Sequence, residues 1–110
     1  MSKSSAWSAG SFFALARSCE RKNLNSPGQV DAILADLDQH LSPRDRRRLK
    51  QGFARGARRG RVFIPRQGWV RNAVDAVECA RTQSVIDDYK TMVDLTLPTA
   101  GLAQSNESLR

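Results

Sequence analysis

The segment SPRDRRRLKQGFARGARRGR, residues 42–61, dominates both the fold and the function that the sequence predicts. From Arg44 to Arg61 it carries nine Lys/Arg residues against one acid, Asp45, for a net charge of +8. The rest of the 110-residue chain holds nine Lys/Arg and ten Asp/Glu, so the formal net charge of +7 arises in this segment. Such a concentration of positive charge indicates a polyanionic partner, most simply nucleic acid.

The same segment has the features of a capped amphipathic helix. Ser42 suits the N-cap, Pro43 the first helical position, and Asp45 the third position of a capping box. On a helical wheel for residues 44–60, small and apolar residues fill one arc, and most arginines fill the opposite one. The first arc holds Leu49, Gly52, Phe53, Gly56, Ala57 and Gly60, and the second holds Arg44, Arg47, Arg48, Gln51, Arg55, Arg58 and Arg59. Arg46 and Lys50 lie near the apolar side.

Glycines at four-residue spacing leave two interpretations of this helix open. Gly52, Gly56 and Gly60 each cost about 1 kcal/mol relative to alanine inside a helix. Their spacing predicts a smooth groove in which another helix approaches closely. The alternative is that the helix stops near Gly56 and that residues 57–60 form a loop.

The remaining chain predicts further helices. We expect disorder over residues 1–9, a short helix from about Ser11 to Lys22, and a helix from Ser26 to about His40 with Ser26 as its N-cap. The apolar stripe of that helix is Val30, Ile33, Leu34, Leu37 and Leu41, and its outer face is acidic. A turn of one or two residues near 41–43 then leads into the arginine-rich helix.

After the basic segment, residues 61–65 suggest an extended connector and Gln67-Gly68 a turn. A long helical pattern follows from near Trp69 to about Leu95, either unbroken or interrupted near residues 82–84. Residues 98–110 suggest a flexible tail. The predicted fold is therefore an all-α domain over residues 10–97, a small bundle of four to five helices with a tight helix-turn-helix corner near 41–43.

This corner has the topology of DNA-binding helix-turn-helix motifs, in which the second helix contacts bases, although it lacks a glycine in the turn. We expect a nucleic-acid-binding protein, in the first place a small DNA-binding regulator or accessory protein. RNA binding is the alternative, and docking on an acidic protein is a third interpretation. The candidate binding residues are Arg44, Arg47, Arg48, Lys50, Arg55, Arg58, Arg59, Arg61, Arg66 and Arg71. Phe63 and Trp69 flank the basic segment, where they either stack on bases or belong to the core.

The sequence offers no set of residues for catalysis or metal binding, so we predict no enzyme, metal or cofactor. His40, the only histidine, lies at a predicted helix end, where it suits a capping role. No nucleotide-binding loop accompanies the spaced glycines, because neither a strand nor a GK[ST] sequence is present.

Cys19 and Cys79 lie sixty residues apart, and the sequence has no CxxC or His-Cys cluster. We expect free thiols in a reducing compartment unless the fold brings the two cysteines together.

The predicted location is intracellular, cytoplasmic or nucleoid-associated. No run of about 20 apolar residues predicts a membrane span. The first 18 residues weakly suggest a targeting segment, and a flexible start is the preferred interpretation. The pattern over residues 69–95 also suggests a homodimer contact.

Overall fold

A computed structural model describes residues 2–97, apart from the side chains of residues 90 and 92–97. Within this range the elements are α1 (Lys3–Arg21), α2 (Gln29–Asp38), α3 (Pro43–Arg59), β1 (Arg61–Ile64), β2 (Gly68–Arg71) and α4 (Ala76–Leu97). The predominantly helical prediction is confirmed, with a small two-stranded sheet added to it. The predicted tail at residues 98–110 lies outside the described residues.

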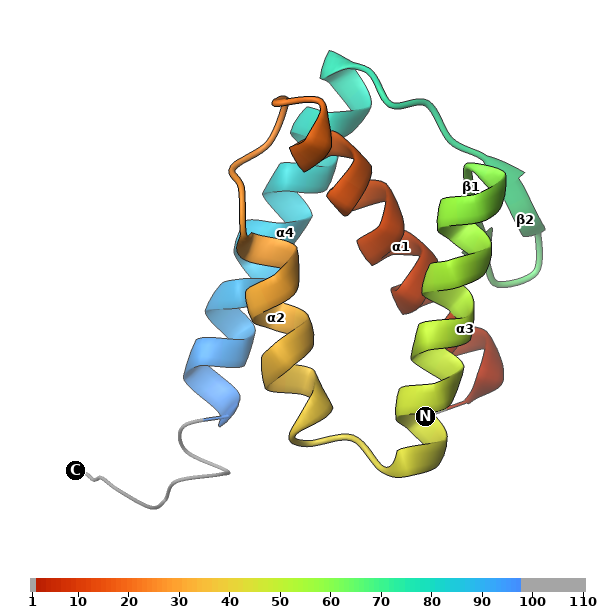
Figure 1. Cartoon of the computed structure of the whole chain (residues 1–110), viewed down its shortest axis with the longest axis vertical. Coiled ribbons are helices and arrows are strands. Elements are labelled where there is room, and N and C mark those ends of the chain that lie inside the picture. Colours follow the sequence, from red (N-terminus) through yellow and green to blue (C-terminus); the bar gives the residue numbers. More distant parts are fainter. Residues whose placement is uncertain (1, 98–110) are drawn as a thin grey trace.

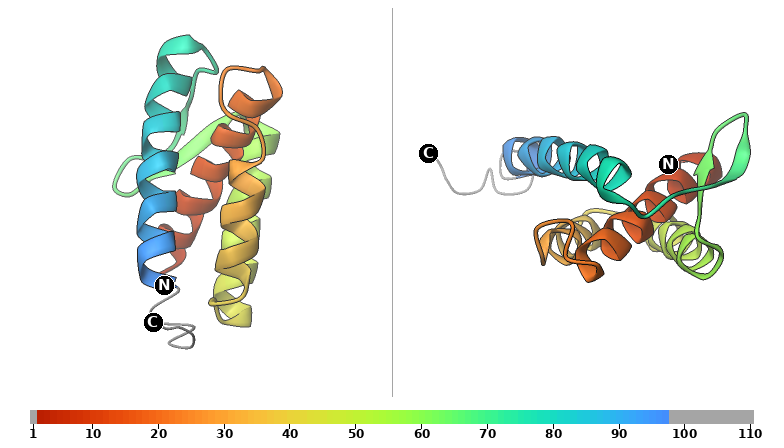
Figure 2. Two further views of the ribbon diagram at one scale, coloured as in Figure 1. Left: turned by 90° about the vertical axis from the view of Figure 1, so that its left-hand side faces the viewer. Right: turned by 90° about the horizontal axis from the view of Figure 1, so that it is seen from above.

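Helix α1 is the centre of the fold. Helix α3 and strand β1 pack on one side of it, and α2 and α4 pack on the other, as Figures 1 and 2 show. A helix with contacts on both sides needs buried residues around most of its circumference. Those of α1 are mostly small: Ala6, Gly10, Ser11, Phe13, Ala14, Leu15, Ala16 and Cys19. Small side chains let neighbouring helices approach closely.

The prediction of disorder over residues 1–9 is wrong from Lys3 onward. Helix α1 begins eight residues before Ser11, with Ser2 as its N-cap, whose Oγ accepts a hydrogen bond from the Ser5 N–H at 3.1 Å. Ala6 is fully buried, so this first turn is part of the core. The serine-rich composition suggested a flexible start, but the tertiary contacts of Ala6 stabilise the helix.

The start of α2 differs from the predicted Ser26 cap. The helix begins at Gln29 and its N-cap is Gly28, which adopts a left-handed conformation (φ 85°) and has no side chain to cap with. Glu20 of α1 takes over this role: its two carboxylate oxygens accept from the N–H groups of Gly28 and Val30, both at 3.1 Å. A negative charge at a helix N-terminus is favourable, and here it comes from a neighbouring helix.

Residues 61–71 form a β-hairpin instead of an extended connector leading into a helix. The strands pair antiparallel, with Val62 opposite Val70 and Phe63 opposite Trp69. Two residues of the turn region have positive φ, Arg66 (75°) and Gly68 (79°). The prediction of a helix from Trp69 is therefore wrong for its first seven residues. Helix α4 starts at Ala76 and runs unbroken through residues 82–84.

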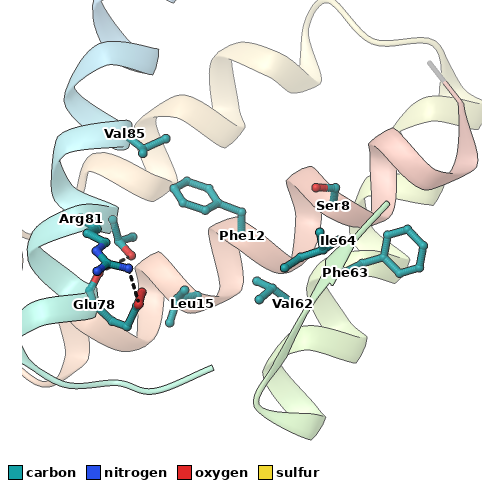
Figure 3. Close-up of a pocket in the computed structure, with 10 residues that line it drawn as sticks. Ser8, Phe12, Leu15, Val62, Phe63, Ile64, Glu78, Arg81 and Val85 are labelled. Carbon is teal, nitrogen blue, oxygen red and sulfur yellow. Dashed lines mark hydrogen bonds and ion pairs between the residues drawn. The ribbon is translucent and has the colours of Figure 1, made fainter. Parts of the chain in front are cut away.

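An apolar groove of about 240 Å³ lies between α1, β1 and α4. Figure 3 shows Phe12 and Leu15 of α1, Val62 and Ile64 of β1, and Val85 of α4 around it. An ion pair between Arg81 and Glu78 (3.2 Å) lies on its α4 side. The groove leaves apolar surface of three elements open toward solvent.

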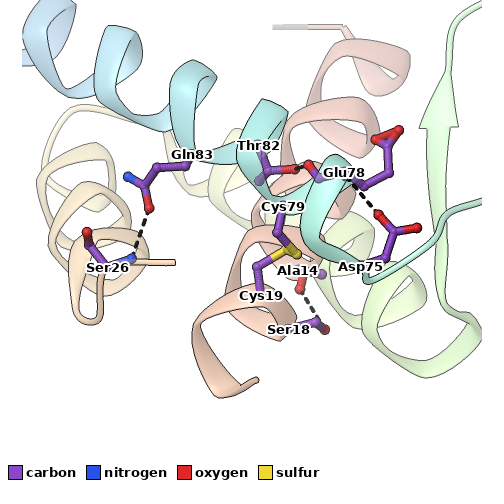
Figure 4. Close-up of a disulfide and its surroundings, with 9 residues drawn as sticks. All are labelled: Ala14, Ser18, Cys19, Ser26, Asp75, Glu78, Cys79, Thr82 and Gln83. Atoms are coloured by element: carbon purple, nitrogen blue, oxygen red, sulfur yellow. Dashed lines mark hydrogen bonds between the residues drawn. A yellow bond between two sulfur atoms is a disulfide. The ribbon is translucent and has the colours of Figure 1, made fainter. Parts of the chain in front are cut away.

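The core consists of two clusters, one of which contains a disulfide. Phe13, Ala16, Val30, Ile33 and Ile86 form the larger cluster between α1, α2 and α4. In the smaller cluster Cys19 of α1 is bonded to Cys79 of α4, with Cα atoms 5.6 Å apart and both residues fully buried (Figure 4). The prediction of free thiols is wrong, because the fold brings the C-terminal end of α1 onto the first turn of α4.

Candidate nucleic-acid interface

Helix α3 forms as its local sequence predicts. Ser42 is the N-cap and its Oγ accepts from the Asp45 N–H at 3.1 Å, while Pro43 occupies the first helical position. The helix continues past Gly52 and Gly56 to Arg59 and ends at Gly60 in a left-handed conformation (φ 61°). The alternative in which the helix stops near Gly56 is therefore wrong. Its 17 residues span about 25 Å.

The glycines of α3 lie directly against the backbone of α1. A Cβ atom on Gly52 would be 2.7 Å from the Cα of Trp7, and one on Gly56 would be 2.9 Å from the Cα of Ser11. On α1, a Cβ on Gly10 would be 2.6 Å from the Phe53 nitrogen. The predicted close approach of another helix is thus confirmed at Gly52 and Gly56, with α1 as the partner, whereas a Cβ on Gly60 would meet nothing within 4 Å. This contact fixes the rotation of α3, so that most of its arginine arc faces away from α1, while Arg55 reaches the Trp7 ring of α1.

Most of the predicted binding residues are exposed, although Lys50 borders a pocket with Arg17 of α1 and Leu34 of α2 instead of lying on the outer side of α3. Arg44, Arg47, Lys50, Arg58, Arg59, Arg66 and Arg71 are exposed, and Arg48, Arg55 and Arg61 are half-buried. Within residues 2–97, the two described ion pairs are Arg17–Asp31 and Arg81–Glu78, and neither involves a predicted binding residue. The acidic face of α2 is therefore not paired with α3 in the described part of the chain; its Asp31 pairs with α1 instead.

Arg46 and His40 have structural roles at the turn between α2 and α3. The Arg46 Nη1 donates to the Asp38 carbonyl oxygen at 2.8 Å. The His40 Nδ1 donates to the Asp36 carbonyl oxygen, also at 2.8 Å, which confirms its predicted capping role. The first bond gives the Asp38 carbonyl at the end of α2 a partner, and the second adds to the bond that the Asp36 carbonyl oxygen accepts from the Gln39 N–H at 3.2 Å. Arg46, on the inner side of α3, thus belongs to the scaffold.

The hairpin adds three arginines beside the end of α3. Arg61 and Arg71 are direct cross-strand partners at its base, and Arg66 lies in its turn. The hairpin is attached to α1 by a hydrogen bond at 2.9 Å from the Phe63 N–H to the Oγ of Ser11, which is fully buried. The basic surface therefore comes from two elements that are both fixed to α1.

An aromatic cluster of Trp7, Phe63 and Trp69 lies next to these arginines. The three ring centroids are 5.4 to 6.0 Å apart, and all three residues are half-buried. The guanidinium of Arg55 lies 4.8 Å from the Trp7 ring centroid, in a cation–π contact. Sequence reasoning identified Phe63 and Trp69 but missed Trp7, which it assigned to a disordered segment.

Two other features are absent from the described residues. None of the helices within residues 2–97 is long and apolar enough to span a bilayer. The same range contains no group of three or more His, Cys, Asp or Glu side chains arranged to hold a metal ion.

No protein-family model, curated protein or solved structure matches this chain. The function is therefore inferred from the chemistry of the surface itself.

Proposed function

We propose that this protein is a nucleic-acid-binding protein, not an enzyme, and that it binds through the outer face of α3 and the β1–β2 hairpin. The observation that carries this proposal is the row of arginines on α3. They are presented by a helix whose opposite side is in backbone contact with α1, and no ion pair with a described residue neutralises them. A rigid, unneutralised cationic surface is matched by the regularly spaced phosphates of a nucleic acid.

Arginine suits this partner better than lysine. Its planar guanidinium forms two parallel hydrogen bonds to a phosphate or to a guanine edge. Binding also releases the counterions condensed on the nucleic acid, which makes the affinity fall steeply with salt concentration. Nearly all the basic residues of this surface are arginines, which favours phosphate contacts over general solvation.

DNA is the preferred ligand in this proposal, because a helix of this width fits the major groove. Helices α2 and α3 are joined by residues 39–42, a longer turn than the one or two residues predicted, and we propose that they act as a helix-turn-helix with α3 as its second helix. The role that we propose is a small DNA-binding regulator or accessory protein. Binding to RNA is the alternative, and competition between DNA and RNA duplexes of equal length distinguishes them.

The double variant R47Q/R58Q tests the site. Both side chains are exposed on α3, and glutamine preserves helix propensity, so the fold should be unaffected. We expect the affinity for a DNA duplex to fall roughly 10- to 100-fold at about 0.1 M salt. The slope of log K against log salt should also become shallower by about 1.8, since each phosphate contact contributes about 0.9.

The matched control is R21Q/K22Q, which removes the same charge from the exposed end of α1. We expect its affinity to stay within a few-fold of the wild-type value. Equal losses in the two variants would show that only net charge matters and would contradict the assignment of the site. Capture of an acidic protein that survives nuclease treatment, without measurable binding to any nucleic acid, would favour the third interpretation.

We also propose a homodimer through α4, which would present two basic surfaces to one duplex. Val77 and Val85 of α4 are 65% and 49% exposed, and Val85 borders the apolar groove. Burial of this apolar surface in a dimer would be favourable. Sedimentation that detects only monomer at tens of micromolar protein would refute the dimer.

The disulfide bears on the compartment in which the protein works. The intracellular location predicted from the sequence assumed free thiols, whereas disulfides persist mainly in oxidising compartments. The Cys19–Cys79 bond therefore weighs against the cytoplasm. Alkylation of the protein in freshly lysed native cells tests this: two blocked thiols support the intracellular prediction, and a resistant pair supports an oxidising compartment.

A further inference from the structure

We infer that the aromatic cluster of Trp7, Phe63 and Trp69 and the arginines around it form a subsite for unpaired nucleotides. The protein would then bind single-stranded segments there, in addition to phosphates along α3. This inference rests on the proposed function, because it names the kind of nucleic acid that the hairpin side of the surface contacts.

The hairpin register places aromatic rings and guanidinium groups on the same face. Arg61 and Phe63 lie on one face of β1, because side chains two residues apart in a strand point the same way. Their cross-strand partners, Arg71 and Trp69, lie on the same face of β2. Val62 and Ile64 point to the other face, toward the groove, as Figure 3 shows. The hairpin therefore has an apolar face that borders the groove, with Ile64 exposed, and an aromatic-basic face that contacts Trp7 of α1.

The two arginines at the base of the hairpin are direct cross-strand partners, and the Arg61 Nη1 donates to the Trp69 carbonyl oxygen at 3.5 Å. The Asn72 N–H donates to the Gly60 carbonyl oxygen at 3.2 Å, so the next pair, Arg61 and Arg71, is a non-hydrogen-bonded pair, in which side chains lie closer. Like charges directly opposite each other destabilise a hairpin. A phosphate bound between the two guanidinium groups would remove this repulsion, which points to an anion at this position.

The aromatic rings complete a nucleotide site beside that anion position. Trp69 lies two residues before Arg71 on the same face of β2, and its ring centroid is 5.4 Å from that of Phe63. On the other side of the cluster, Trp7 carries two cations: Arg55 at 4.8 Å and the Lys3 Nζ at 5.0 Å from its ring centroid. Half-buried rings surrounded by cations are the combination with which proteins stack bases and hold phosphates of single strands.

The contacts of Phe63 and Trp69 with Trp7 are one of several attachments of the hairpin to α1. Val62 packs against the cluster of Leu15, Cys19 and Cys79, and the Phe63 backbone is bound to Ser11. The rings retain exposed surface although the hairpin is already attached to the core through its other face. A base in a duplex remains stacked on its neighbours, so these rings are available only to unpaired bases.

Tryptophan fluorescence measures this directly, because both tryptophans of the chain, Trp7 and Trp69, belong to the cluster. We would titrate the full chain with a single-stranded thymidine oligonucleotide and with a DNA duplex of the same length. We expect the single strand to quench the emission in proportion to binding, whereas the duplex binds along α3 with little quenching.

Two variants make the test independent of folding problems. Trp69→Leu keeps an apolar side chain but removes the stacking surface, and should weaken single-strand binding roughly 5- to 150-fold while duplex affinity changes less than about twofold. Arg71→Gln changes an exposed residue, and should make the salt slope for the single strand shallower by about 0.7. A thermal unfolding curve for each variant establishes that it is folded.

The outcomes separate this inference from the proposed function. Suppose that the duplex binds, that the single strand does not quench the emission, and that both variants keep the wild-type affinity for the single strand. This result would overturn the aromatic subsite and leave the α3 proposal standing. Absence of binding to either oligonucleotide would overturn both. Selective loss of single-strand binding in Trp69→Leu, with quenching in the wild type, would support the subsite.

Discussion

The double variant C19A/C79A is expected to lose roughly 4 kcal/mol of unfolding free energy relative to the disulfide-bonded protein. The bond joins residues sixty positions apart, so it removes a large amount of chain entropy from the unfolded state. A single small domain has a typical total stability of about 5–15 kcal/mol. Urea unfolding monitored by circular dichroism should therefore show a much lower midpoint in the variant, and wild-type protein in reductant should behave similarly.

The loss of stability in the C19A/C79A variant should be largest in α4. Beyond the disulfide, this helix is held by the buried side chains of Ile86 and Thr82 and by hydrogen bonds of Gln83, one of them to the Ser26 N–H (Figure 4). Helix α3, in contrast, is held by α1 and the hairpin. Hydrogen exchange should accelerate more in α4 than in α3, and a folded reduced protein should still bind duplex DNA. Uniform acceleration across both helices would contradict this division.

Helix α3 shows what local sequence can predict. Its start depends on Ser42 and Pro43, its end on Gly60, and its exposed face on the spacing of its arginines. These signals act within a few residues of one another, so they do not depend on the rest of the fold. The bounds of the helix and the exposure of most of its arginines were therefore predictable, whereas the half-burial of Arg48 and Arg55 was not.

The features that the sequence did not reveal depend on contacts between distant residues. The cap of α2 comes from Glu20 of another helix, and the disulfide requires α1 and α4 to meet. The aromatic cluster joins Trp7 to residues more than fifty positions away. None of these pairings leaves a periodic pattern in the chain.

The hairpin is a different case, because it left a local signal. Residues 61–64 and 68–71 are two short runs rich in β-branched and aromatic residues. Three residues separate them and the second run begins with Gly68, which is typical of a hairpin. The helical spacing that begins at Trp69 obscured this signal. Strand propensity was the better guide over residues 69–71, and helical periodicity was correct only from Ala76.

The substitution Gly10→Ala is expected to destabilise the protein by roughly 3 kcal/mol, although alanine is the better helix former. The added Cβ would lie 2.6 Å from the Phe53 nitrogen and closer still to the Leu49 carbonyl oxygen. Both obstacles are backbone atoms of α3, so no side-chain rotation relieves the collision. The two helices must move apart, which opens the packing around Leu49 and Ala6, both buried.

The sign of the effect distinguishes packing from helix propensity. Propensity alone predicts a gain of about 1 kcal/mol for Gly10→Ala, whereas the α1–α3 contact predicts a loss. Ser4→Ala is the matched control, because it places alanine at an exposed position of the same helix and should change the stability by less than about 0.5 kcal/mol. Because the contact also orients the arginines of α3, Gly10→Ala should weaken duplex binding even where the protein is folded. A stabilised Gly10→Ala variant with unchanged binding would mean that α1 does not position α3.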